Sequence, residues 1–182
     1  MPKKIALITG ISGQDGAYLA KFLLEKNYKI IGVERRSARS SNWRLEKLKI
    51  SKKILFEDAD IKELNNLIRL FSKYKIDEIY NLAAQSFVKT SFSTPINTCD
   101  VNALGVLRIL ECIRNNSKKT KFFQASTSEM IGNSNEKIQN ENSVFNPQSP
   151  YGIAKLFAHN IVKNYREAYN LFACSAISFN HE

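Results

Sequence analysis

The sequence predicts an α/β protein built on a doubly wound, Rossmann-like parallel sheet. Short apolar runs alternate with segments of helical spacing along the 182 residues, and a glycine-rich turn at residues 10–16 follows the first run. Polar residues gather where later apolar runs end. Strands separated by helices pair in parallel, because a parallel connection has to cross over the sheet, and helices then cover both faces.

The predicted strands are apolar runs bounded by turn residues, and the predicted helices repeat apolar residues every three or four positions. Strands are expected at residues 4–9, 29–34, 54–57, 78–82, 121–126 and 172–178. Helices are expected from the glycine-rich turn to about residue 26, and at residues 60–74, 102–114 and 150–169. Ligands of such sheets bind at the carboxyl ends of the strands, where the candidate residues below fall.

The composition indicates one soluble globular domain. Hydrophobic residues make up 43% and charged residues 24% of a chain too short for two full domains. The formal charge of +10 raises the alternative of a nucleic-acid surface. However, basic residues are scattered among acidic ones, as in Lys62-Glu63 and Arg166-Glu167, and no motif that reads nucleic acid accompanies them. A solvated, lysine-rich surface that favours a small anionic substrate is the better interpretation.

Cysteine usage and the absence of export signals predict a cytoplasmic protein. Cys99, Cys112 and Cys174 form no close pair and no metal-ligand spacing, which is typical of reduced thiols. The apolar run at residues 5–8 is too short for a signal peptide, and no stretch reaches membrane-spanning length. We therefore expect no metal, no nucleic acid and no membrane partner.

The turn after the first strand has the spacing of a dinucleotide-binding loop. Thr9 precedes a run in which glycines recur at positions 10, 13 and 16, where the first helix begins. Glycines permit a tight turn and let a pyrophosphate approach backbone N–H groups at the helix N-terminus. Three turn glycines without a ligand are the alternative. We expect residues 1–182 to form an NAD(P)-binding domain, with cofactor contacts at Gly10, Gly13, Gln14, Asp15 and Gly16.

The end of the second strand bears on the choice of cofactor. Glu34 stands where an acid would bind the ribose 2′-hydroxyl of NAD. Arg35 and Arg36 follow at once, and guanidinium groups there suit the additional phosphate of NADP. Glu34 could instead pair with one of these arginines on the surface. The two arginines favour NADP over NAD.

The helix expected at residues 150–169 opens with a candidate base. Ser149 is suited to the N-cap, and Pro150 takes the first helical position. Tyr151 and Lys155 are four residues apart, so their side chains share one helix face. A nearby ammonium lowers the pKa of a tyrosine, which makes its phenolate available as a base near neutral pH. The alternative is a buried Tyr151 beside a solvated Lys155.

The fifth predicted strand ends in a cluster of hydroxyls and one acid at residues 124–129. Thr127 can hydrogen-bond a reacting substrate oxygen, and Glu129 can remove a proton. Ordinary turn chemistry for the hydroxyls and a solvated loop position for Glu129 are the alternatives.

Together these segments resemble the GDP-mannose 4,6-dehydratases, a family of extended short-chain dehydrogenases/reductases. The resemblance runs nearly end to end, and residues 85–86 and 180–182 are more diagnostic than the glycines. Met130-Ile131-Gly132 lacks the aromatic residue that the family usually places before this glycine, and Glu34 is unusual before the arginines. The matching stretches are residues 8–19, 35–37, 80–86, 124–129, 149–152 and 179–182.

The resemblance implies further site residues. Cofactor contacts are implied at Asp60, Ile61, Leu82, Ala83 and Ala84, which border the adenine and the cofactor ribose, and at Tyr151, Lys155 and His181. Substrate contacts are implied at Ser86, Thr127, Glu129, Asn180 and Glu182. A packing role for Ser86, Asn180 and Glu182 and a structural role for His181 are the alternatives.

The resemblance also implies an internal redox cycle on GDP-mannose. Tyr151 takes the proton of the C4 hydroxyl while hydride passes to NADP⁺. Thr127 orients the C4 oxygen, and Lys155 holds the ribose and adjusts the pKa of Tyr151. Glu129 removes the C5 proton that the 4-ketone acidifies and assists loss of the C6 hydroxyl as water, and the hydride returns to C6. The product is GDP-4-keto-6-deoxymannose, a precursor of fucose and other deoxyhexoses.

Members of the family assemble as homodimers or homotetramers and continue for about a further hundred residues or more, a size that suits a substrate-binding domain. We therefore expect that domain to be largely absent from this chain, and the chain alone to bind NADP(H) weakly and turn over nothing. Two alternatives stay open. One is an epimerase or a dehydratase for another nucleotide sugar, and Glu129 argues against the epimerase because epimerases do not require a carboxylate there. The other is a non-catalytic nucleotide-binding remnant.

Overall fold

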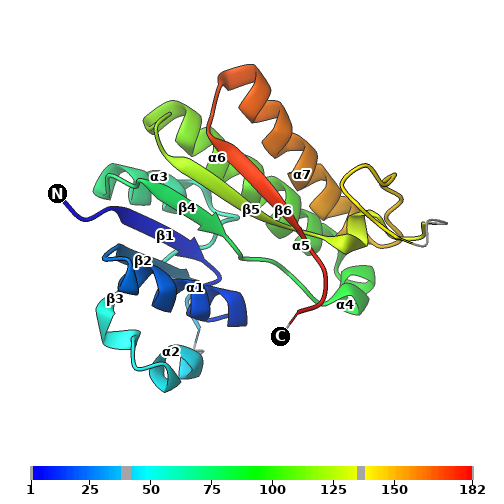
Figure 1. Ribbon diagram of the computed structural model, residues 1–182. Helices are drawn as coiled ribbons and strands as arrows, with labels where there is room; N and C mark the ends of the chain where they lie inside the picture. The colour runs from blue at the N-terminus through cyan, green and yellow to red at the C-terminus, as the bar shows by residue number, and fades with distance from the viewer. Residues whose placement is uncertain (1, 38–41, 135–137, 182) are drawn as a thin grey trace.

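The structure, a computed structural model, describes residues 2–37, 42–134 and 138–181. Its strands match the predicted ones to within a residue at each end: β1 (Ile5–Thr9), β2 (Lys29–Glu34), β3 (Ile54–Asp58), β4 (Glu78–Asn81), β5 (Lys121–Thr127) and β6 (Ala173–Ser178). All pair in parallel in one sheet of order β3-β2-β1-β4-β5-β6 (Figure 1). The order reverses between β1 and β4, which is where doubly wound sheets bind ligands. The predicted fold class is confirmed.

Helices connect the strands. They are α1 (Gln14–Glu25), α2 (Trp43–Lys47), α3 (Leu64–Lys73), α4 (Val88–Ser93), α5 (Pro95–Cys99), α6 (Gly105–Asn116) and α7 (Pro150–Tyr169). In Figure 1, α3, α6 and α7 lie behind the sheet, and α1 and α2 lie in front of its β1–β3 end. Among the described residues, no helix combines the length and the apolar character needed to cross a bilayer.

Successive strand residues enter two different cores. On β1, Ala6 and Ile8 pack with Leu45 on the α1 and α2 side, whereas Leu7 packs with Ile79 on the side of α3, α6 and α7. Strands buried on both faces need apolar residues at nearly every position, which explains the continuous apolar runs in the sequence.

On the face of the sheet that packs against α1, helices do not fully cover β5 and β6. Phe122 and Ala173 face α7 and are buried. Their neighbours point to the opposite face, where Phe123 is half-buried and Cys174 is exposed. These two strands lie unobscured in Figure 1. The predicted cover on both faces therefore holds for β1–β3 and only in part for β5 and β6.

Two predicted helices differ in extent. The helix predicted from residue 60 begins at Leu64, because Asp60 Oδ1 accepts the Lys62 N–H at 3.0 Å and forms a local turn instead. The helix predicted at residues 102–114 begins within a π-helical segment, Asp100–Leu104, and continues as α6 from Gly105 to Asn116; α5 precedes the π-helical segment. Helical spacing does not predict α5, because Ile96 is 85% exposed while Thr98 is buried.

Glu57 joins β3 to α3. Its carboxylate is only 7% exposed and receives Arg69 Nη1 at 2.7 Å, Lys73 Nζ at 2.6 Å and the Tyr74 hydroxyl. Hydrogen bonds from Lys73, Tyr74 and Arg69 favour the charged form and lower the pKa of Glu57 from 4.5 to about 2.

We expect Glu57→Gln to lower the free energy of unfolding by about 1–2 kcal/mol near neutral pH, since both cations are partly exposed and screened. The folded-state pKa lies below the unfolded value, so this stabilisation is complete above about pH 4.5 and is lost as the pH falls toward 2. Urea unfolding across this pH range should show the free energies of unfolding of the wild type and of Glu57→Gln becoming equal in acid. Glu167→Gln, at an exposed site on α7, is the control, and a Glu57→Gln deficit that is independent of pH would contradict the assignment.

Candidate active site

Glycines let the turn after β1 fold back tightly. Gly10 has a φ of +69°, and a Cβ there would lie 2.9 Å from Ala83 N in the loop after β4. A Cβ on Gly16 would lie 2.5 Å from Gly10 O and 2.7 Å from Ile11 Cα. Side chains do not approach backbone this closely, so both positions require glycine. The Gly13 N–H donates to Gly10 O at 3.0 Å and closes the turn.

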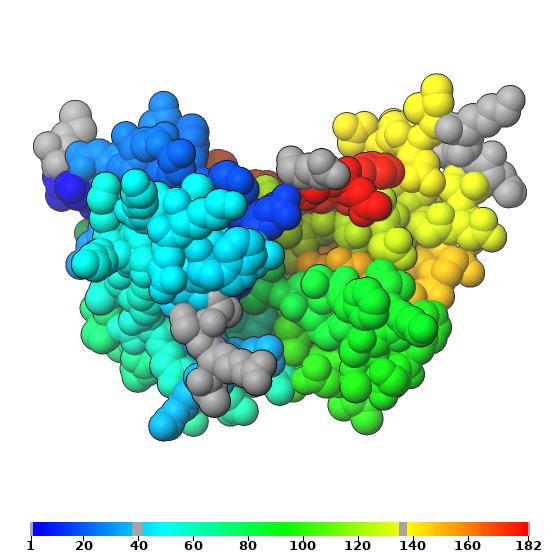
Figure 2. All heavy atoms as spheres, turned by 90° about the horizontal axis from the view of Figure 1, so that it is seen from below, coloured from blue at the N-terminus to red at the C-terminus, as the bar shows by residue number. Residues whose placement is uncertain are grey.

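The turn presents the N-terminus of α1 to a cleft. Gly13 is the N-cap and offers no side-chain cap, so the first N–H groups of α1 are available to an anion. Figure 2 shows this side hollowed between the N-terminal part, in blue and cyan, and the segment in green. The cleft measures about 620 Å³ and is lined by Gly10, Gly13, Gln14, Asp15, Gly16, Leu82, Ser86, Phe179, Asn180 and His181. The glycine cradle and the open helix end fit the pyrophosphate of a nicotinamide cofactor.

A chain of buried hydrogen bonds ties three strands together at their carboxyl ends. Thr9 Oγ1 donates to Asn81 Oδ1 at 2.6 Å, and Asn81 Nδ2 donates to Gln124 Oε1 at 2.7 Å. Gln124 Nε2 continues the chain to Ala125 O at 2.8 Å. Thr9 Oγ1 also accepts the backbone N–H groups of residues 82 and 83, which holds the loop after β4 against the phosphate loop.

Asn102 fixes the next part of that loop. It is buried in the π-helical segment; its Oδ1 accepts the Gln85 N–H and its Nδ2 donates to Gln85 O, both at 2.9 Å. The paired bonds fix the backbone beside Ser86, which lines the cleft. Sequence analysis missed Asn102; the available signal was a polar residue between two apolar ones, Val101 and Ala103.

Tyr151 and Lys155 lie side by side on α7. Ser149 Oγ accepts a backbone N–H of the first turn at 3.0 Å, which confirms the predicted N-cap. Tyr151 is 8% and Lys155 4% exposed, and Lys155 Nζ lies 5.9 Å from the centre of the Tyr151 ring. Lys155 Nζ donates to Ala125 O at 2.8 Å. The alternative of a solvated Lys155 is therefore wrong.

The predicted lowering of the Tyr151 pKa is also wrong for this arrangement. Burial is the largest influence and raises the pKa of Tyr151, while a hydrogen bond with Thr127 lowers it and the Glu129 charge raises it. Burial also lowers the pKa of Lys155 to about 8, because the ammonium loses its hydration. For both groups the loss of hydration on burial is the largest influence on the pKa, and the ammonium donates its hydrogen bond to Ala125 O.

Thr127 and Glu129 lie next to Tyr151. Thr127 ends β5 and caps the short helix η3 (Ser128–Met130), accepting the Glu129 N–H at 3.3 Å. Glu129 is exposed, and its backbone oxygen lies so close to α7 that a Cβ on Gly152 would approach it to 2.6 Å. The structure therefore brings the four predicted catalytic residues, Thr127, Glu129, Tyr151 and Lys155, to one place beyond the end of β5.

The residues predicted to choose the cofactor lie at the ends of β2 and β3. Glu34 pairs in register with Asp58. Its Oε2 accepts a hydrogen bond from Asn42 Nδ2 at 3.2 Å, so the alternative of a surface pair with an arginine is wrong. Arg35 and Arg36 are exposed, and neither makes an ion pair within the described residues.

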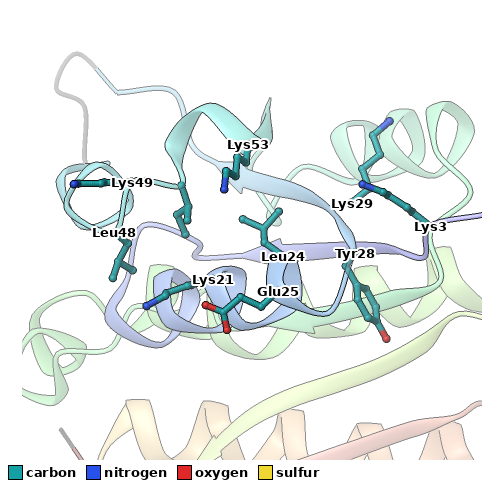
Figure 3. Close-up of a pocket in the computed structure, with 10 residues that line it drawn as sticks. Lys3, Lys21, Leu24, Glu25, Tyr28, Lys29, Leu48, Lys49 and Lys53 are labelled. Carbon is teal, nitrogen blue, oxygen red and sulfur yellow. The ribbon is translucent and has the colours of Figure 1, made fainter.

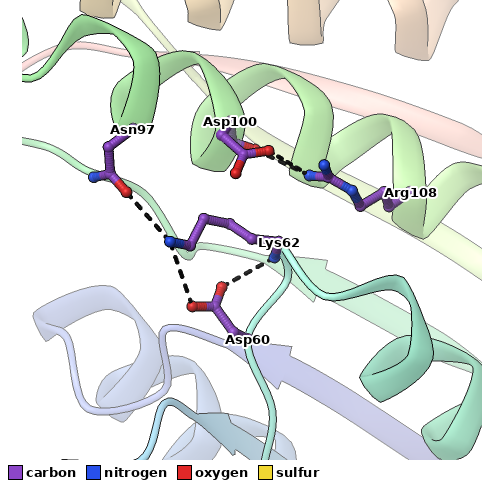
Figure 4. A network of polar contacts seen from close by, with 5 residues as sticks. All are labelled: Asp60, Lys62, Asn97, Asp100 and Arg108. Carbon is purple, nitrogen blue, oxygen red and sulfur yellow. Dashed lines mark hydrogen bonds and ion pairs between the residues drawn. The ribbon is translucent and has the colours of Figure 1, made fainter.

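Asp60 and Ile61 follow β3. Lys62 Nζ lies 4.0 Å from Asp60 Oδ2 and donates to Asn97 Oδ1 at 3.4 Å, which links the end of β3 to α5 (Figure 4). The side chain of Ile61 is buried against Gly105, so any cofactor contact of Ile61 comes from its backbone.

Arg44 is a second residue that sequence analysis missed. It lies on α2, where its Nη1 donates to Ser12 O in the phosphate loop at 3.3 Å and its guanidinium stacks 4.3 Å from the centre of the Trp43 ring. Five residues are too few for helical spacing to predict α2.

The segment after β6 folds back over the phosphate loop. His181 Nε2 lies 3.1 Å from Asp15 Oδ1, and its Nδ1 lies 2.8 Å from Phe179 O. The contact with Phe179, followed by the one with Asp15, raises the pKa of His181. Asn180 lines the cleft. Glu182, predicted to contact substrate, lies outside the described residues.

A second cavity of about 680 Å³ lies at the amino ends of β1 and β2 (Figure 3). No predicted site residue falls there. Its lining combines an apolar wall with exposed charged side chains: Lys3, Lys21, Leu24, Glu25, Tyr28, Lys29, Leu48, Lys49, Ile50 and Lys53. The five lysines belong to the solvated basic surface that the sequence predicts.

We expect Gly16→Ala to lower the free energy of unfolding by about 1–3 kcal/mol, since its Cβ would overlap Gly10 O and Ile11 Cα. Gly13→Ala is the matched variant, because its Cβ would meet only Gly10 O at 3.1 Å. Denaturant unfolding of both variants measures the difference. Equal losses would mean that close packing does not explain the glycine at position 16.

Lys155→Met should leave the free energy of unfolding unchanged or raise it by about 1–3 kcal/mol near neutral pH, because it removes a buried charge and Ala125 O keeps its bond from Gln124. The folded-state pKa of about 8 lies below the ordinary 10.5. The ammonium therefore destabilises the fold below about pH 8, and the effect fades as the pH rises toward 10.5. Unfolding curves across this range test it, with exposed Lys163→Met on the same helix as control. A clear loss of stability in Lys155→Met would show that the ammonium supports the fold.

Comparison with known proteins identifies the family. The sequence model of the family described as GDP-mannose 4,6 dehydratase matches residues 7–182. The chain is 48% identical to the GDP-mannose 4,6-dehydratase of Vibrio cholerae serotype O1 and 47% identical to the GDP-mannose 4,6 dehydratase of Homo sapiens, in each case over 100% of this chain and 51% of the relative. The chain thus spans about half the length of the curated relatives it matches.

Solved structures share the fold. UDP-glucose 4-epimerase from Thermotoga maritima superposes with a TM-score of 0.81 at 29% identity, over 92% of this chain and 52% of that one. The dTDP-glucose 4,6-dehydratase of Streptomyces venezuelae, solved with NAD, superposes with a TM-score of 0.80 at 23% identity, over 92% of this chain and 53% of that one. With the family model matched from β1 to the last residue, the chain belongs to the GDP-mannose 4,6-dehydratase family.

Proposed function

We propose that the protein converts GDP-mannose to GDP-4-keto-6-deoxymannose by internal hydride transfer and loss of water. Two facts support this. Curated relatives called GDP-mannose 4,6-dehydratase align over the whole chain, and the residues that the reaction needs lie together beyond the end of β5, at the same edge of the parallel sheet as the phosphate loop. The chain spans half of those relatives, so the reaction is assigned to the full-length protein.

The observation that carries the proposal is the carboxylate beside the tyrosine. A Cβ on Gly152, the residue after Tyr151, would lie 2.6 Å from Glu129 O, and the charge of Glu129 is near enough to raise the pKa of Tyr151. A reductase or an epimerase needs only the tyrosine, threonine and lysine. A dehydratase also needs a base for the carbon next to the ketone, and Glu129 is a carboxylate close to Tyr151 that can take this role.

In the first half of the reaction, Tyr151 accepts the proton of the C4 hydroxyl. Thr127 donates a hydrogen bond that keeps the C4 oxygen in line with the phenol, and Lys155 stabilises the phenolate electrostatically. When bound, the cofactor accepts a hydride from C4 and returns it to C6.

In the second half, the C4 ketone acidifies the C5 proton, which Glu129 removes. Protonated Glu129 then delivers a proton to the leaving C6 hydroxyl, which departs as water. When C6 is reduced, Tyr151 gives the proton that it took from the C4 hydroxyl to C5, so that the tyrosine ends as it began and the sum of the steps is loss of one water from the sugar. Glu129 is exposed, which suits contact with a substrate that arrives from outside.

The cofactor that we propose is NADP. Exposed Arg35 and Arg36 can close on a ribose 2′-phosphate, because neither is engaged in an ion pair among the described residues. A cytoplasmic location is proposed on the unpaired thiols Cys99, Cys112 and Cys174.

The test uses the full-length protein with GDP-mannose and a catalytic amount of NADP⁺. Formation of the 4-keto sugar is expected, and Glu129→Gln should lower kcat by about 10²–10⁴-fold while NADP⁺ affinity stays the same, because only proton removal from C5 is lost. Glu141→Gln, an exposed acid outside the cleft, should keep full activity. If GDP-mannose stays unchanged, the proposed reaction is wrong. If Glu129→Gln keeps full activity, Glu129 is not the base that removes the C5 proton.

A further inference from the structure

Five lysines surround the cavity at the amino ends of β1 and β2 (Figure 3). Within the described residues none of the five makes an ion pair, whereas Lys4, Lys62 and Lys73 each lie within ion-pair distance of a carboxylate. Glu25 is the single acid in the lining. The solvated lysines therefore give this cavity an excess of positive charge that its own lining does not balance.

The topology brings these lysines together from separate parts of the sequence. β1 and β2 are parallel, with Ile5 in register with Lys29, so both strands begin at this edge of the sheet. α1 returns to the same edge and contributes Lys21 from its second half. The segment between α2 and β3 contributes Lys49 and Lys53. The cavity thus lies at the edge opposite the one that holds the phosphate loop and the candidate catalytic residues.

The cavity has an apolar floor behind the ammonium groups. Ile50 is buried. Leu24, Leu48 and Tyr28 are half-buried, whereas all five lysines are exposed. The Tyr28 hydroxyl already donates to Glu78 Oε1 at 3.1 Å, and no other lining residue has a hydroxyl or an amide side chain. Such a lining selects a ligand by its negative charge and apolar volume, because few side-chain groups remain to read a hydrogen-bond pattern.

Lys49 holds a conformation that is unusual for lysine. Its φ is +57°, in the left-handed region, where a Cβ is strained. The Ile50 N–H donates to Leu45 O at 3.0 Å, and the Lys49 N–H donates to Glu46 O at 2.9 Å. These bonds form a Schellman motif at the end of α2, in which glycine is the usual residue at the position of Lys49. A side chain kept there in spite of the strain points to a function, and this side chain lines the cavity.

We propose that this cavity binds a short acidic peptide segment of a partner protein. An aliphatic side chain of the peptide packs on the apolar floor, and its carboxylates pair with the lysines. The formal charge of +10 speeds the encounter with an acidic partner. The proposal is independent of the proposed reaction, because the two sites lie at opposite edges of the sheet.

The recessed floor favours a peptide over a lipid surface. A protein lies on a membrane by burying apolar side chains that protrude, such as those on one face of an amphipathic helix. Here the apolar groups lie behind exposed ammonium groups, so a bilayer can reach the charges but not the floor. A peptide side chain is small enough to enter.

The experiment measures binding of a fluorescein-labelled peptide, Glu-Glu-Leu-Leu-Glu-Glu, to the full-length protein by fluorescence anisotropy. Saturable binding is expected, and it should weaken by at least about threefold when the ionic strength rises from about 0.05 M to about 0.5 M. Glu-Glu-Ser-Ser-Glu-Glu with the same label keeps the charge and loses the leucines, so it should bind about tenfold more weakly or less. Equal affinity for the two peptides overturns the proposal, because charge alone would then explain the binding.

Variants locate the peptide on the surface. Lys21→Ala combined with Lys49→Gly should lower the affinity by about tenfold or more. Lys118→Ala combined with Lys163→Ala removes the same charge at exposed positions outside the cavity, and should leave the affinity within about twofold. Glu25→Gln removes the one carboxylate of the lining and should tighten binding. Equal losses in the two double variants overturn the proposal.

Lys49→Gly separates binding from folding. Glycine relieves the left-handed backbone, so the urea midpoint of this variant should rise while its affinity for the peptide falls. A loss of affinity therefore cannot be assigned to misfolding. An unchanged affinity in a folded Lys49→Gly protein shows that the side chain does not serve the site and overturns its part in the proposal.

Two further outcomes overturn the proposal as a whole. NADP⁺, the proposed cofactor, should not displace the peptide; displacement would place the peptide in the cleft of the phosphate loop. Vesicles of phosphatidylcholine and phosphatidylserine should not bind through the cavity; vesicle binding that Lys21→Ala with Lys49→Gly abolishes, with no binding of the peptide, would identify a membrane as the partner. A wild type that binds neither peptide nor vesicles shows that the cavity is a solvated basic surface only.

Discussion

The site depends on the buried hydrogen-bond chain that runs from Thr9 through Asn81 to Gln124. Thr9 precedes the phosphate loop, and Gln124 bonds to Ala125 O, the same oxygen that receives Lys155 Nζ. Apolar packing would hold these strands together without fixing one position of the cofactor loop relative to α7, because it is not directional. Directed bonds among fully buried groups do fix it, and each partner that is lost leaves another group unsatisfied.

The candidate catalytic residues Tyr151 and Lys155 show a conflict between the stability of the fold and the chemistry proposed for them. Lys155 is buried among groups that cannot hydrate it, and Tyr151 is buried enough that its pKa rises. A fold selected for stability alone would place an apolar residue at position 155. Perturbed ionisable groups that lie close together are characteristic of active sites, and the proximity of Thr127 and Glu129 makes that interpretation more specific than the spacing of Tyr151 and Lys155 alone.

Local patterns in the sequence predicted those features of the structure that depend on residues close together in the chain. The positions of the six strands, the Ser149 cap and the turn glycines each depend on neighbours within a few residues, and the structure has them as predicted, whereas burial of both faces holds fully only for β1–β3. Asn102 and Arg44 were not predicted, because they act on Gln85 and Ser12, which are distant in sequence. The direction of the Tyr151 pKa was missed for the same reason: burial is a property of the packed fold, and helical spacing shows only that Lys155 is near.

The adenosine end of the site follows from strand geometry. Glu34 and Arg35 are consecutive, but Glu34 is the last residue of β2 and Arg35 lies beyond it, exposed. The sheet therefore holds the acid inward, toward the face of α1, and leaves the arginine free to turn toward solvent or ligand. Two adjacent residues with opposite charge therefore face in different directions at this edge of the sheet. The sequence alone does not show this separation, because it depends on Glu34 still following the alternation of β2 and on the hydrogen bond by which Asn42 holds its carboxylate.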